Sequence, residues 1–219
     1  YMRGTMDVWE QLGFDFAAVS TGFIVSEAQS ELTADFCLRQ ARKGVRIFVD
    51  PIMGDDGHLY NGITEKTAQH LRRLVSCADV TVPNYTEAAY LTGLPYRPEG
   101  AEAGELTEMV DALRAIGAKN VVITSAAGKD APGQKVVVGY DCARDEYFTL
   151  PFEEIPVRFP GTGDIFSAVL MGRVLEGWPL RDAAQSAMDA VKRMIEINRD
   201  KRDKYKGIPL ETCLEVLDE

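Results

Sequence analysis

Short unbroken apolar runs alternate with segments of helical spacing along most of the chain. Runs of apolar, often β-branched residues are typical of strands buried on both sides in a parallel sheet. Apolar residues repeated every three or four positions instead predict amphipathic helices. The predicted strands are 14–25, 45–49, 79–82 and 120–124, and the predicted helices are 1–12, 27–43, 64–75, 83–93 and 106–116.

The pattern changes after residue 133. Segments 135–140 and 146–150 are two apolar runs joined by a short polar turn, which predicts an antiparallel hairpin at a sheet edge. Segment 155–159 leads into a glycine-rich turn, and three helices close the chain, the last over 209–217. The whole pattern predicts one α/β domain over 1–219, with a mostly parallel central sheet, right-handed crossovers and helices on both faces.

The glycine-rich turn at 159–164 (FPGTGD) is where we expect a strand to stop and a helix to start. Gly161 and Gly163 leave the backbone bare at the helix N-terminus, where unpaired N–H groups and the positive dipole end favour an anion. Asp164 would repel a bound phosphate unless a metal screens it or it accepts the proton of an attacking hydroxyl, as a kinase base does. The alternative is a structural helix with a favourable acidic first turn.

Charge and composition narrow the possible partners. The chain has 24 Lys and Arg against 34 Asp and Glu, a net charge of −10, which repels nucleic acids and acidic membranes, so any phosphate must be held locally. Without an apolar run near ~20 residues or a signal-peptide layout, we predict a cytoplasmic protein. The spacing of Cys37, Cys77, Cys142 and Cys213 predicts free thiols rather than a metal site or disulfides.

Four polar clusters fall at the predicted carboxyl ends of strands, where open α/β sheets bind their ligands. They are 21–23 (TGF), 50–55 (DPIMGD), 84–87 (NYTE) and 161–164 (GTGD). Their agreement favours the kinase interpretation of the glycine-rich turn over the structural one.

These clusters resemble the ribokinase-like superfamily, and within it the pyridoxal (vitamin B6) kinases. The matching residues are VDPIMGD at 49–55 with Gly57 and Tyr60, PN at 83–84 with Glu87, VVITS at 121–125 and GTGD at 161–164. Hydroxymethylpyrimidine kinases of this superfamily usually carry cysteine in place of Asp164, and sugar kinases usually carry alanine in place of Thr162. The chain therefore resembles the vitamin B6 branch, and it contains no P-loop sequence.

The resemblance implies a homodimeric enzyme that uses ATP and Mg²⁺ to phosphorylate the hydroxymethyl group of pyridoxal, pyridoxamine or pyridoxine. Asp164 would be the general base, and the N–H groups of Gly161, Thr162 and Gly163 would form the anion hole. Mg²⁺ would be held by Asp50, Asp55 and Glu87, partly through water. ATP would bind Asp50, Asp55, Tyr60, Asn84, Glu87, Thr124 and Ser125, and the vitamer would contact Phe23.

Each of these side chains also has a structural explanation. The alternatives are Asp50 as a turn former, Asn84 and Glu87 as a capping box, Tyr60 as a loop aromatic on the core, and Thr124 and Ser125 as a strand end.

The chain departs from the family pattern in two ways. These kinases begin with a strand and an early helix that contact the pyridine substrate, and we expect this chain to begin after them, as an N-terminally incomplete domain. Phe23 stands where many relatives carry tyrosine, and Val82 stands where threonine is common. Two other functions stay open: a hydroxymethylpyrimidine kinase, which Asp164 disfavours, and a non-catalytic nucleotide-binding fragment or pseudo-enzyme.

Overall fold

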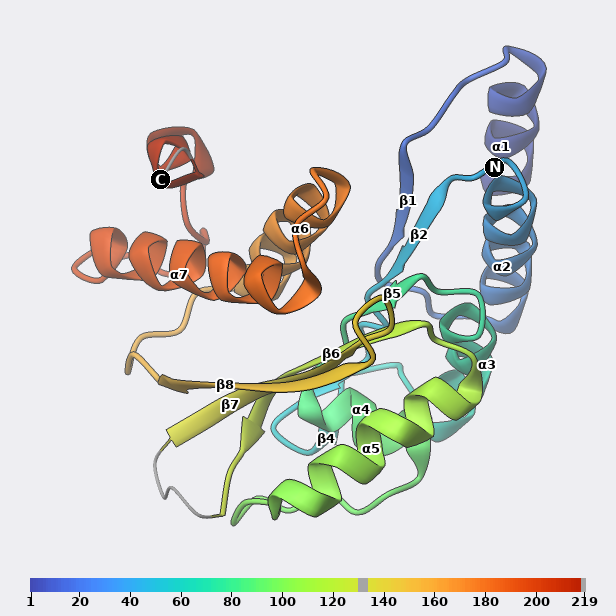
Figure 1. Cartoon of the computed structure of the whole chain (residues 1–219). Coiled ribbons are helices and arrows are strands. Elements are labelled where there is room, and N and C mark those ends of the chain that lie inside the picture. Colours follow the sequence, from blue (N-terminus) through green and yellow to red (C-terminus); the bar gives the residue numbers. More distant parts are fainter. Residues whose placement is uncertain (130–133, 218–219) are drawn as a thin grey trace.

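The computed structural model describes residues 1–129 and 134–217, and in them six strands form one sheet in the order β1-β2-β5-β6-β7-β8 (Figure 1). The first four are parallel, and β7 and β8 are antiparallel to their neighbours. The strands are β1 (Ala18–Thr21), β2 (Arg46–Val49), β5 (Val80–Thr81), β6 (Asn120–Ala127), β7 (Gln134–Asp141) and β8 (Glu146–Glu153). The predicted mixed sheet, with its antiparallel hairpin at one edge, is confirmed.

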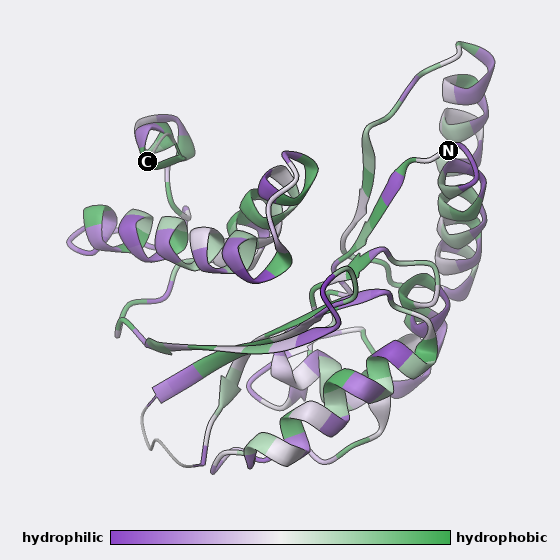
Figure 2. Cartoon of the chain, in the orientation of Figure 1, coloured by the Kyte–Doolittle hydropathy of each residue, from purple (hydrophilic) through white to green (hydrophobic). Residues whose placement is uncertain are grey.

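Helices cover both faces of this sheet, as predicted. They are α1 (Met2–Gln11), α2 (Glu27–Ala41), α3 (Glu65–Val75), α4 (Tyr85–Thr92), α5 (Ala103–Ile116), α6 (Thr162–Leu175) and α7 (Leu180–Asn198). Ile47 and Val49 of β2 pack with α2 to α5, whereas Phe48 between them packs with α6 and α7. Successive strand residues point to opposite faces, so each strand needs apolar side chains throughout. Figure 2 shows that α7, by contrast with the strands, has a hydrophobic side and a hydrophilic side.

The first strand is shorter and less buried than its apolar sequence predicts. The ladder with β2 begins only where the Arg46 N–H donates to the Ala17 carbonyl at 3.3 Å. Before that point, Phe16 packs edge-on against Trp9 of α1, with ring centroids 5.8 Å apart. The aromatic run therefore serves the contact between α1 and α2, and β1 lies at the edge of the described sheet with Ser20 exposed.

The C-terminal region and several connecting segments also differ from expectation. Segment 155–159 has no regular structure, because β8 is the last strand and ends at Glu153. The expected helix at 209–217 is two short 3₁₀ segments, η1 (Leu210–Thr212) and η2 (Leu214–Leu217). The acidic loop that begins at Asp50 continues into a two-stranded hairpin, β3 (Gly54–Asp55) with β4 (His58–Leu59). The strand expected at 120–124 is longer, since β6 continues to Ala127, and residues 130–133 lie outside the described residues.

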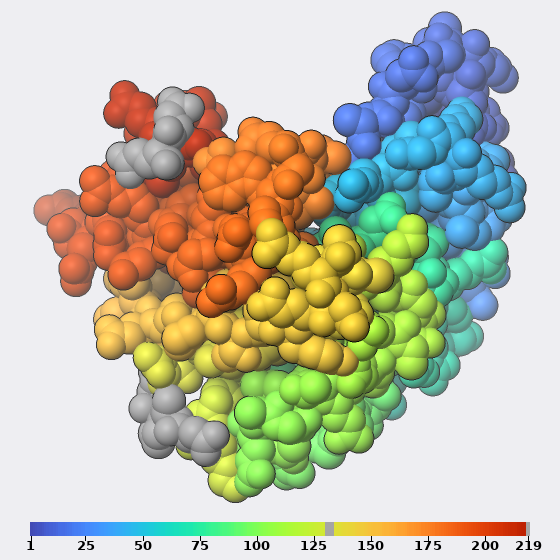
Figure 3. Space-filling view, in the orientation of Figure 1, coloured from blue at the N-terminus to red at the C-terminus, as the bar shows by residue number. Residues whose placement is uncertain are grey.

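The helices at the beginning and at the end of the chain lie apart on the surface of the molecule. Figure 3 shows α1 and β1 at one end of the molecule and α6 and α7 at the other, with a notch between them. Among the helices that the structure describes, none has the length and apolarity needed to cross a membrane.

Candidate active site

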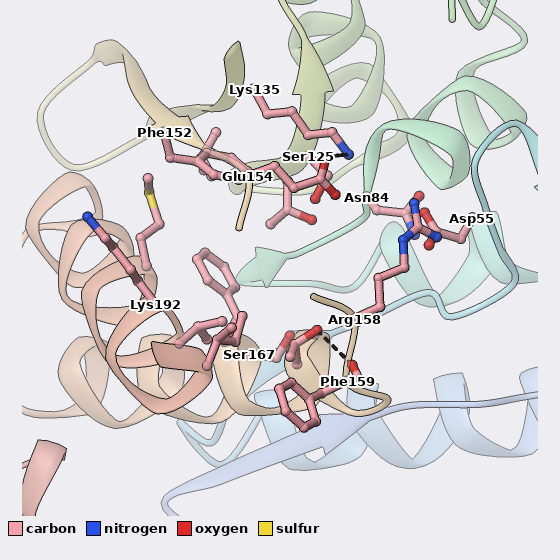
Figure 4. Close-up of a pocket in the computed structure, with 18 of the residues that line it drawn as sticks. Asp55, Asn84, Ser125, Lys135, Phe152, Glu154, Arg158, Phe159, Ser167 and Lys192 are labelled. Atoms are coloured by element: carbon pink, nitrogen blue, oxygen red, sulfur yellow. Dashed lines mark hydrogen bonds and ion pairs between the residues drawn. The ribbon is translucent and has the colours of Figure 1, made fainter. Parts of the chain in front are cut away.

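One cavity gathers the predicted site residues. It has a volume of about 710 Å³ and lies between the carboxyl ends of the central strands, the β7–β8 hairpin and the helices α6 and α7. Figure 4 shows Ser125 and Lys135 on its sheet side, Lys192 on α7 and Ser167 on α6. The predicted residues in its lining are Asp50, Asp55, Tyr60, Asn84, Glu87, Thr124, Ser125, Gly161, Thr162, Gly163 and Asp164.

The N-terminus of α6 opens into this cavity. Gly161 precedes the helix with φ of 85°, a left-handed conformation that glycine adopts without strain, and no side chain of the described residues caps the helix. The Ile165 N–H makes the first intrahelical hydrogen bond, to the Gly161 carbonyl at 3.0 Å. The N–H groups of Thr162, Gly163 and Asp164 precede that bond and are the ones left to bind an anion. The exposed Asp164 carboxylate belongs to the same turn.

A second carboxylate, Asp50, stands beside that turn at the end of β2. The Ser167 hydroxyl, one helical turn after Asp164, donates to Asp50 Oδ2 at 2.8 Å (Figure 4). Burial raises the pKa of Asp50 to about 6; the Ser167 hydrogen bond opposes this shift, and the Asp164 charge adds to it. The two carboxylates are therefore electrostatically coupled across the floor of the cavity.

The N-terminus of α4 lies on the same cavity, but side chains of its own first turn cap it, so we call this turn closed. Asn84 Oδ1 accepts the Glu87 N–H at 2.9 Å, and Glu87 Oε2 accepts the Asn84 N–H at 2.8 Å, so the capping box that the spacing suggested is present. Glu87 Oε1 also accepts the Met53 N–H at 3.0 Å. Burial raises the pKa of Glu87 to about 8, against the lowering effect of these N–H donors.

Thr124 and Ser125 interrupt β6 at the cavity wall. The register with β7 shifts between Ile123 and Ala126, and Ser125 has φ of 58°. The Thr124 N–H donates to the Pro83 carbonyl at 2.9 Å, and Thr124 bridges Asn84 in parallel, so β6 stays paired on its β5 side while its β7 side is interrupted. These residues are thus a bulge that turns polar groups toward the cavity, rather than the plain strand end of the structural alternative.

Of the two predicted aromatic residues, Tyr60 lies in the cavity lining and Phe23 does not. Tyr60 lines the cavity at the end of the β3–β4 hairpin, where partial burial and then the charges of Asp55 and Glu87 raise its pKa. Phe23 is 55% exposed and lies outside the cavity lining, so its contact with a vitamer stays a prediction.

Sequence reasoning missed Ser167 and three cationic side chains of the cavity. Ser167 is separated from Asp50 by 117 positions, and no spacing rule connects a helical serine to a distant aspartate. Lys135, Arg158 and Lys192 line the cavity from β7, the segment before α6, and α7. Helical spacing from Met188 and Ile195 places Lys192 on the cavity side of α7, but that signal is weak in a helix with many charges.

The oxygen donors fit a magnesium ion held partly through water. Within residues 1–129 and 134–217, no three His, Cys, Asp or Glu side chains converge as a ready-made metal site. Asp50 and Glu87 offer hard carboxylate oxygens, already partly engaged by Ser167 and by backbone N–H groups. Mg²⁺ usually keeps several waters and takes one or two carboxylates together with substrate phosphates, so an open donor set of this kind suits it.

Comparison with known proteins identifies the family. The model of the family described as phosphomethylpyrimidine kinase matches residues 9–208. The chain belongs to this family. A relative from Bordetella avium, named pyridoxine/pyridoxal/pyridoxamine kinase, is 32% identical over 177 residues, which cover 78% of this chain and 56% of the relative. The chain therefore spans little more than half the length of that relative.

Solved structures with a similar fold support this family assignment. A Bacteroides thetaiotaomicron structure with pyridoxal, provisionally named a phosphomethylpyrimidine kinase, is 30% identical with a TM-score of 0.91, covering 100% of this chain and 76% of that one. Pyridoxal kinase from Leishmania donovani, in complex with ADP and pyridoxamine, is 25% identical with a TM-score of 0.82, covering 100% and 76%. The fold is ribokinase-like, as the motif resemblance implied.

Proposed function

We propose that this protein transfers the γ-phosphoryl group of ATP to the hydroxymethyl group of pyridoxal, pyridoxamine or pyridoxine. The observation that carries the proposal is the start of α6, where open N–H groups and the Asp164 carboxylate face one cavity of about 710 Å³. Support comes from the Bordetella relative named for all three vitamers and from the Leishmania structure that holds ADP with pyridoxamine.

The chemistry follows from the order of groups along the first turn of α6. The Asp164 carboxylate accepts the proton of the substrate hydroxyl as its oxygen attacks the γ-phosphorus. A new P–O bond to the vitamer forms while the bond to the β–γ bridging oxygen breaks, so ADP leaves with that oxygen. The N–H groups of Thr162 and Gly163 stabilise the negative charge on the transferring phosphoryl group.

A second carboxylate, Asp50, lies beside this turn and is positioned by Ser167. The Ser167 hydroxyl donates to Asp50 Oδ2 at 2.8 Å, and Asp50 lines the cavity. Bound Mg²⁺ would neutralise phosphate charge, and Asp50, Asp55 and Glu87 would hold it, partly through water. A cation there would offset the repulsion between Asp50 and Asp164, and Asp164 would act as the base.

A hydroxymethylpyrimidine is the second candidate substrate, because the family that matches residues 9–208 is described as phosphomethylpyrimidine kinase. Both substrates present a hydroxymethyl group on a heteroaromatic ring, so the same proton transfer would serve either. Asp164 favours the vitamin B6 substrate, because the motif resemblance places cysteine at this position in hydroxymethylpyrimidine kinases. A non-catalytic nucleotide-binding protein is the remaining alternative.

On the same resemblance we propose a cytoplasmic homodimer built from one kinase domain per chain. Size-exclusion chromatography with light scattering tests the dimer, and a single-chain mass would contradict it.

The test of the function is a product assay on the purified protein. Wild type is incubated with ATP and Mg²⁺ and, separately, with pyridoxal or hydroxymethylpyrimidine, and products are identified by mass spectrometry. The proposal expects pyridoxal 5′-phosphate and ADP in equal amounts, and none in an Asp164→Asn variant. Phosphorylation of the pyrimidine alone would replace the substrate, and nucleotide binding without any product would support the non-catalytic alternative.

A further inference from the structure

An ion pair crosses the rim of the cavity between two segments that are 102 positions apart. Arg158 Nη1 donates to Asp56 Oδ2 at 2.8 Å, and both residues line the cavity. Arg158 lies three positions before Gly161, on the segment that leads into α6, whereas Asp56 lies at the tip of the β3–β4 hairpin. In Figure 4 the Arg158 side chain reaches away from its own segment toward Asp55 and Asn84.

The hairpin side of this pair is held firmly. The Gly57 N–H donates to Thr86 Oγ1 at 2.8 Å, and Asn84 Nδ2 donates to the Gly54 carbonyl at 2.8 Å. A methyl group added at Gly57 would lie 2.7 Å from the Tyr96 ring, so the turn packs closely on that ring. The position of Asp56 is therefore set by α4 and its neighbours.

The arginine side is freer to change partner. Arg158 lies in a segment without regular structure, and its side chain is 70% exposed. An exposed ion pair of this kind contributes little to stability, because water and salt screen it. The guanidinium can therefore leave Asp56 at small cost when a better partner is present.

The charges that line the cavity favour a phosphate as the alternative partner of the Arg158 guanidinium. The lining contains eight carboxylates against three cations: Asp50, Asp55, Asp56, Glu87, Glu153, Glu154, Asp164 and Asp189, with Lys135, Arg158 and Lys192. Lys135 is already paired with Glu154, with Nζ and Oε2 3.2 Å apart. A polyphosphate needs cationic contacts in such surroundings, and a guanidinium binds phosphate through two parallel hydrogen bonds.

We propose that Arg158 is a nucleotide-phosphate ligand and that Asp56 is its exchange partner, so that binding of the polyphosphate breaks the Arg158–Asp56 pair. This inference rests on the proposed function, because it takes ATP as the phosphate donor. The guanidinium would contact the β- or γ-phosphate from the same segment that presents the anion hole of α6. Asp56 then competes with the nucleotide for one cation.

The proposal makes opposite predictions for the two members of the pair. Arg158→Gln should weaken binding of Mg²⁺–ADP and of a non-hydrolysable ATP analogue by about tenfold, because a charge-assisted contact is lost. Binding of AMP should change much less, since AMP lacks the β- and γ-phosphates. Asp56→Asn should strengthen binding of both polyphosphates by about two- to fivefold, because the competing carboxylate is gone.

A matched ion pair elsewhere provides the control. Arg73 Nη2 and Asp35 Oδ1 are 2.7 Å apart between α3 and α2, outside the cavity lining, and the Asp35 side chain is 55% exposed against 54% for Asp56. Arg73→Gln and Asp35→Asn should leave nucleotide binding unchanged. Arg158→Lys retains the charge without the paired donors and should lie between wild type and Arg158→Gln.

Isothermal titration of the full chain with each nucleotide measures these effects, with thermal melts to verify folding. Opposite shifts for Arg158→Gln and Asp56→Asn, limited to ADP and the ATP analogue, are the expected result. Equal weakening by both variants would show a purely structural pair and overturn the proposal, as would an unchanged affinity of Arg158→Gln. If wild type itself binds no nucleotide, the proposed function fails as well, which separates the two failures.

Discussion

Two helices begin at the same cavity, and their first turns are built differently. At α4 the side chains of Asn84 and Glu87 fold back onto the backbone, and Glu87 is buried. At α6 the cap position is Gly161, no described side chain caps the helix, and Asp164 is exposed. A closed first turn has its N–H groups satisfied by the protein itself, whereas an open one must find a ligand or water.

The comparison of the two first turns distinguishes a carboxylate that caps its helix, Glu87, from one that does not, Asp164. Both turns contain a carboxylate three residues after the helix cap, at Glu87 and at Asp164, so sequence spacing alone treats them alike. The Glu87 carboxylate accepts hydrogen bonds from Met53 and Asn84, which occupy both of its oxygens. Asp164 is exposed beside the open N–H groups, and in the proposed mechanism it would accept the proton of the substrate. We therefore expect the capping contacts of the closed turn to govern stability, alongside the proposed Mg²⁺ contact of Glu87, and the open turn to govern the rate of phosphoryl transfer.

The largest expected effect is on the rate of an Asp164→Asn variant. The amide has the shape of the carboxylate but cannot accept the hydroxyl proton, so kcat should fall by about 10²–10⁴-fold, with nucleotide affinity nearly unchanged. Steady-state assays with pyridoxal and ATP measure this. Asp189→Asn is the matched control, because Asp189 also lines the cavity but lies on α7 and is paired with Gln185. A variant with more than about a tenth of wild-type kcat would remove Asp164 from the mechanism.

The closed turn should make stability depend on pH. Glu87 has a pKa of about 8 in the folded chain against an ordinary 4.5, so the folded state binds its proton more tightly than the unfolded state does. The stability contributed by that proton is complete below pH 4.5 and is lost as the pH rises through about 8. Asp50, with a pKa of about 6, acts in the same direction over a lower range.

We expect the free energy of unfolding of the metal-free protein to fall by on the order of 4 kcal/mol between about pH 5 and about pH 8. Glu87→Gln should flatten most of that slope, and Glu108→Gln, at an exposed position of α5, should not. Urea unfolding at several pH values provides the measurement. A Glu87→Gln variant with the wild-type slope would show that the carboxyl is not protonated in the folded chain.

A smaller effect is expected from glycine substitutions in the open turn. Gly161 has φ of 85°, and an alanine there is strained by about 1–3 kcal/mol. An added methyl group would lie 3.7 Å from Asp164 Oδ2, an ordinary contact, so the cost comes from the backbone conformation alone. Gly163 lies within α6 with no atom within 4 Å of an added methyl, so Gly163→Ala should not lower the melting temperature. Equal melting temperatures for both variants would contradict the strained start of α6.

The smallest expected effect on stability is that of Asn84→Ala, which removes one member of the capping box. Its loss should cost about 1–2 kcal/mol, because the Glu87 N–H loses its acceptor and the Gly54 carbonyl loses its donor. Thr64→Ala, in the capping box of α3 away from the cavity, should cost a similar amount. Urea unfolding of the two variants compares them, and an unchanged midpoint for Asn84→Ala would show that the closed turn is not stabilising.

The fold was largely predictable, because each central strand must bury both of its faces. The unbroken apolar run that contains Ile47, Phe48 and Val49 indicated a parallel strand, and the structure divides these residues between two cores. The prediction was wrong where apolar residues serve another contact. Phe14 and Phe16 stack on each other beside α1, and a residue pattern cannot separate that packing from a strand.

The candidate site was predictable as a set of motifs but not as an arrangement of charges. Spacing identified the turns that contain Asp50, Glu87 and Asp164. It could not reveal that Ser167 holds Asp50 or that Arg158 reaches Asp56, because these pairs join positions 117 and 102 apart. The structural and functional interpretations of Asn84 and Glu87 are also compatible, since the capping box forms and lines the cavity.

The most direct test of the division between the two turns is a single-turnover measurement on Asp164→Asn and Asn84→Ala side by side. Each variant, in excess over ATP and with saturating pyridoxal and Mg²⁺, is quenched at short times to give the rate of phosphoryl transfer, and its melting temperature is measured in parallel. The account predicts that Asp164→Asn loses the transfer rate and keeps its melting temperature, while Asn84→Ala loses melting temperature and keeps most of the rate. An Asp164→Asn variant that transfers phosphate at nearly the wild-type rate, with Asn84→Ala slower, would contradict it.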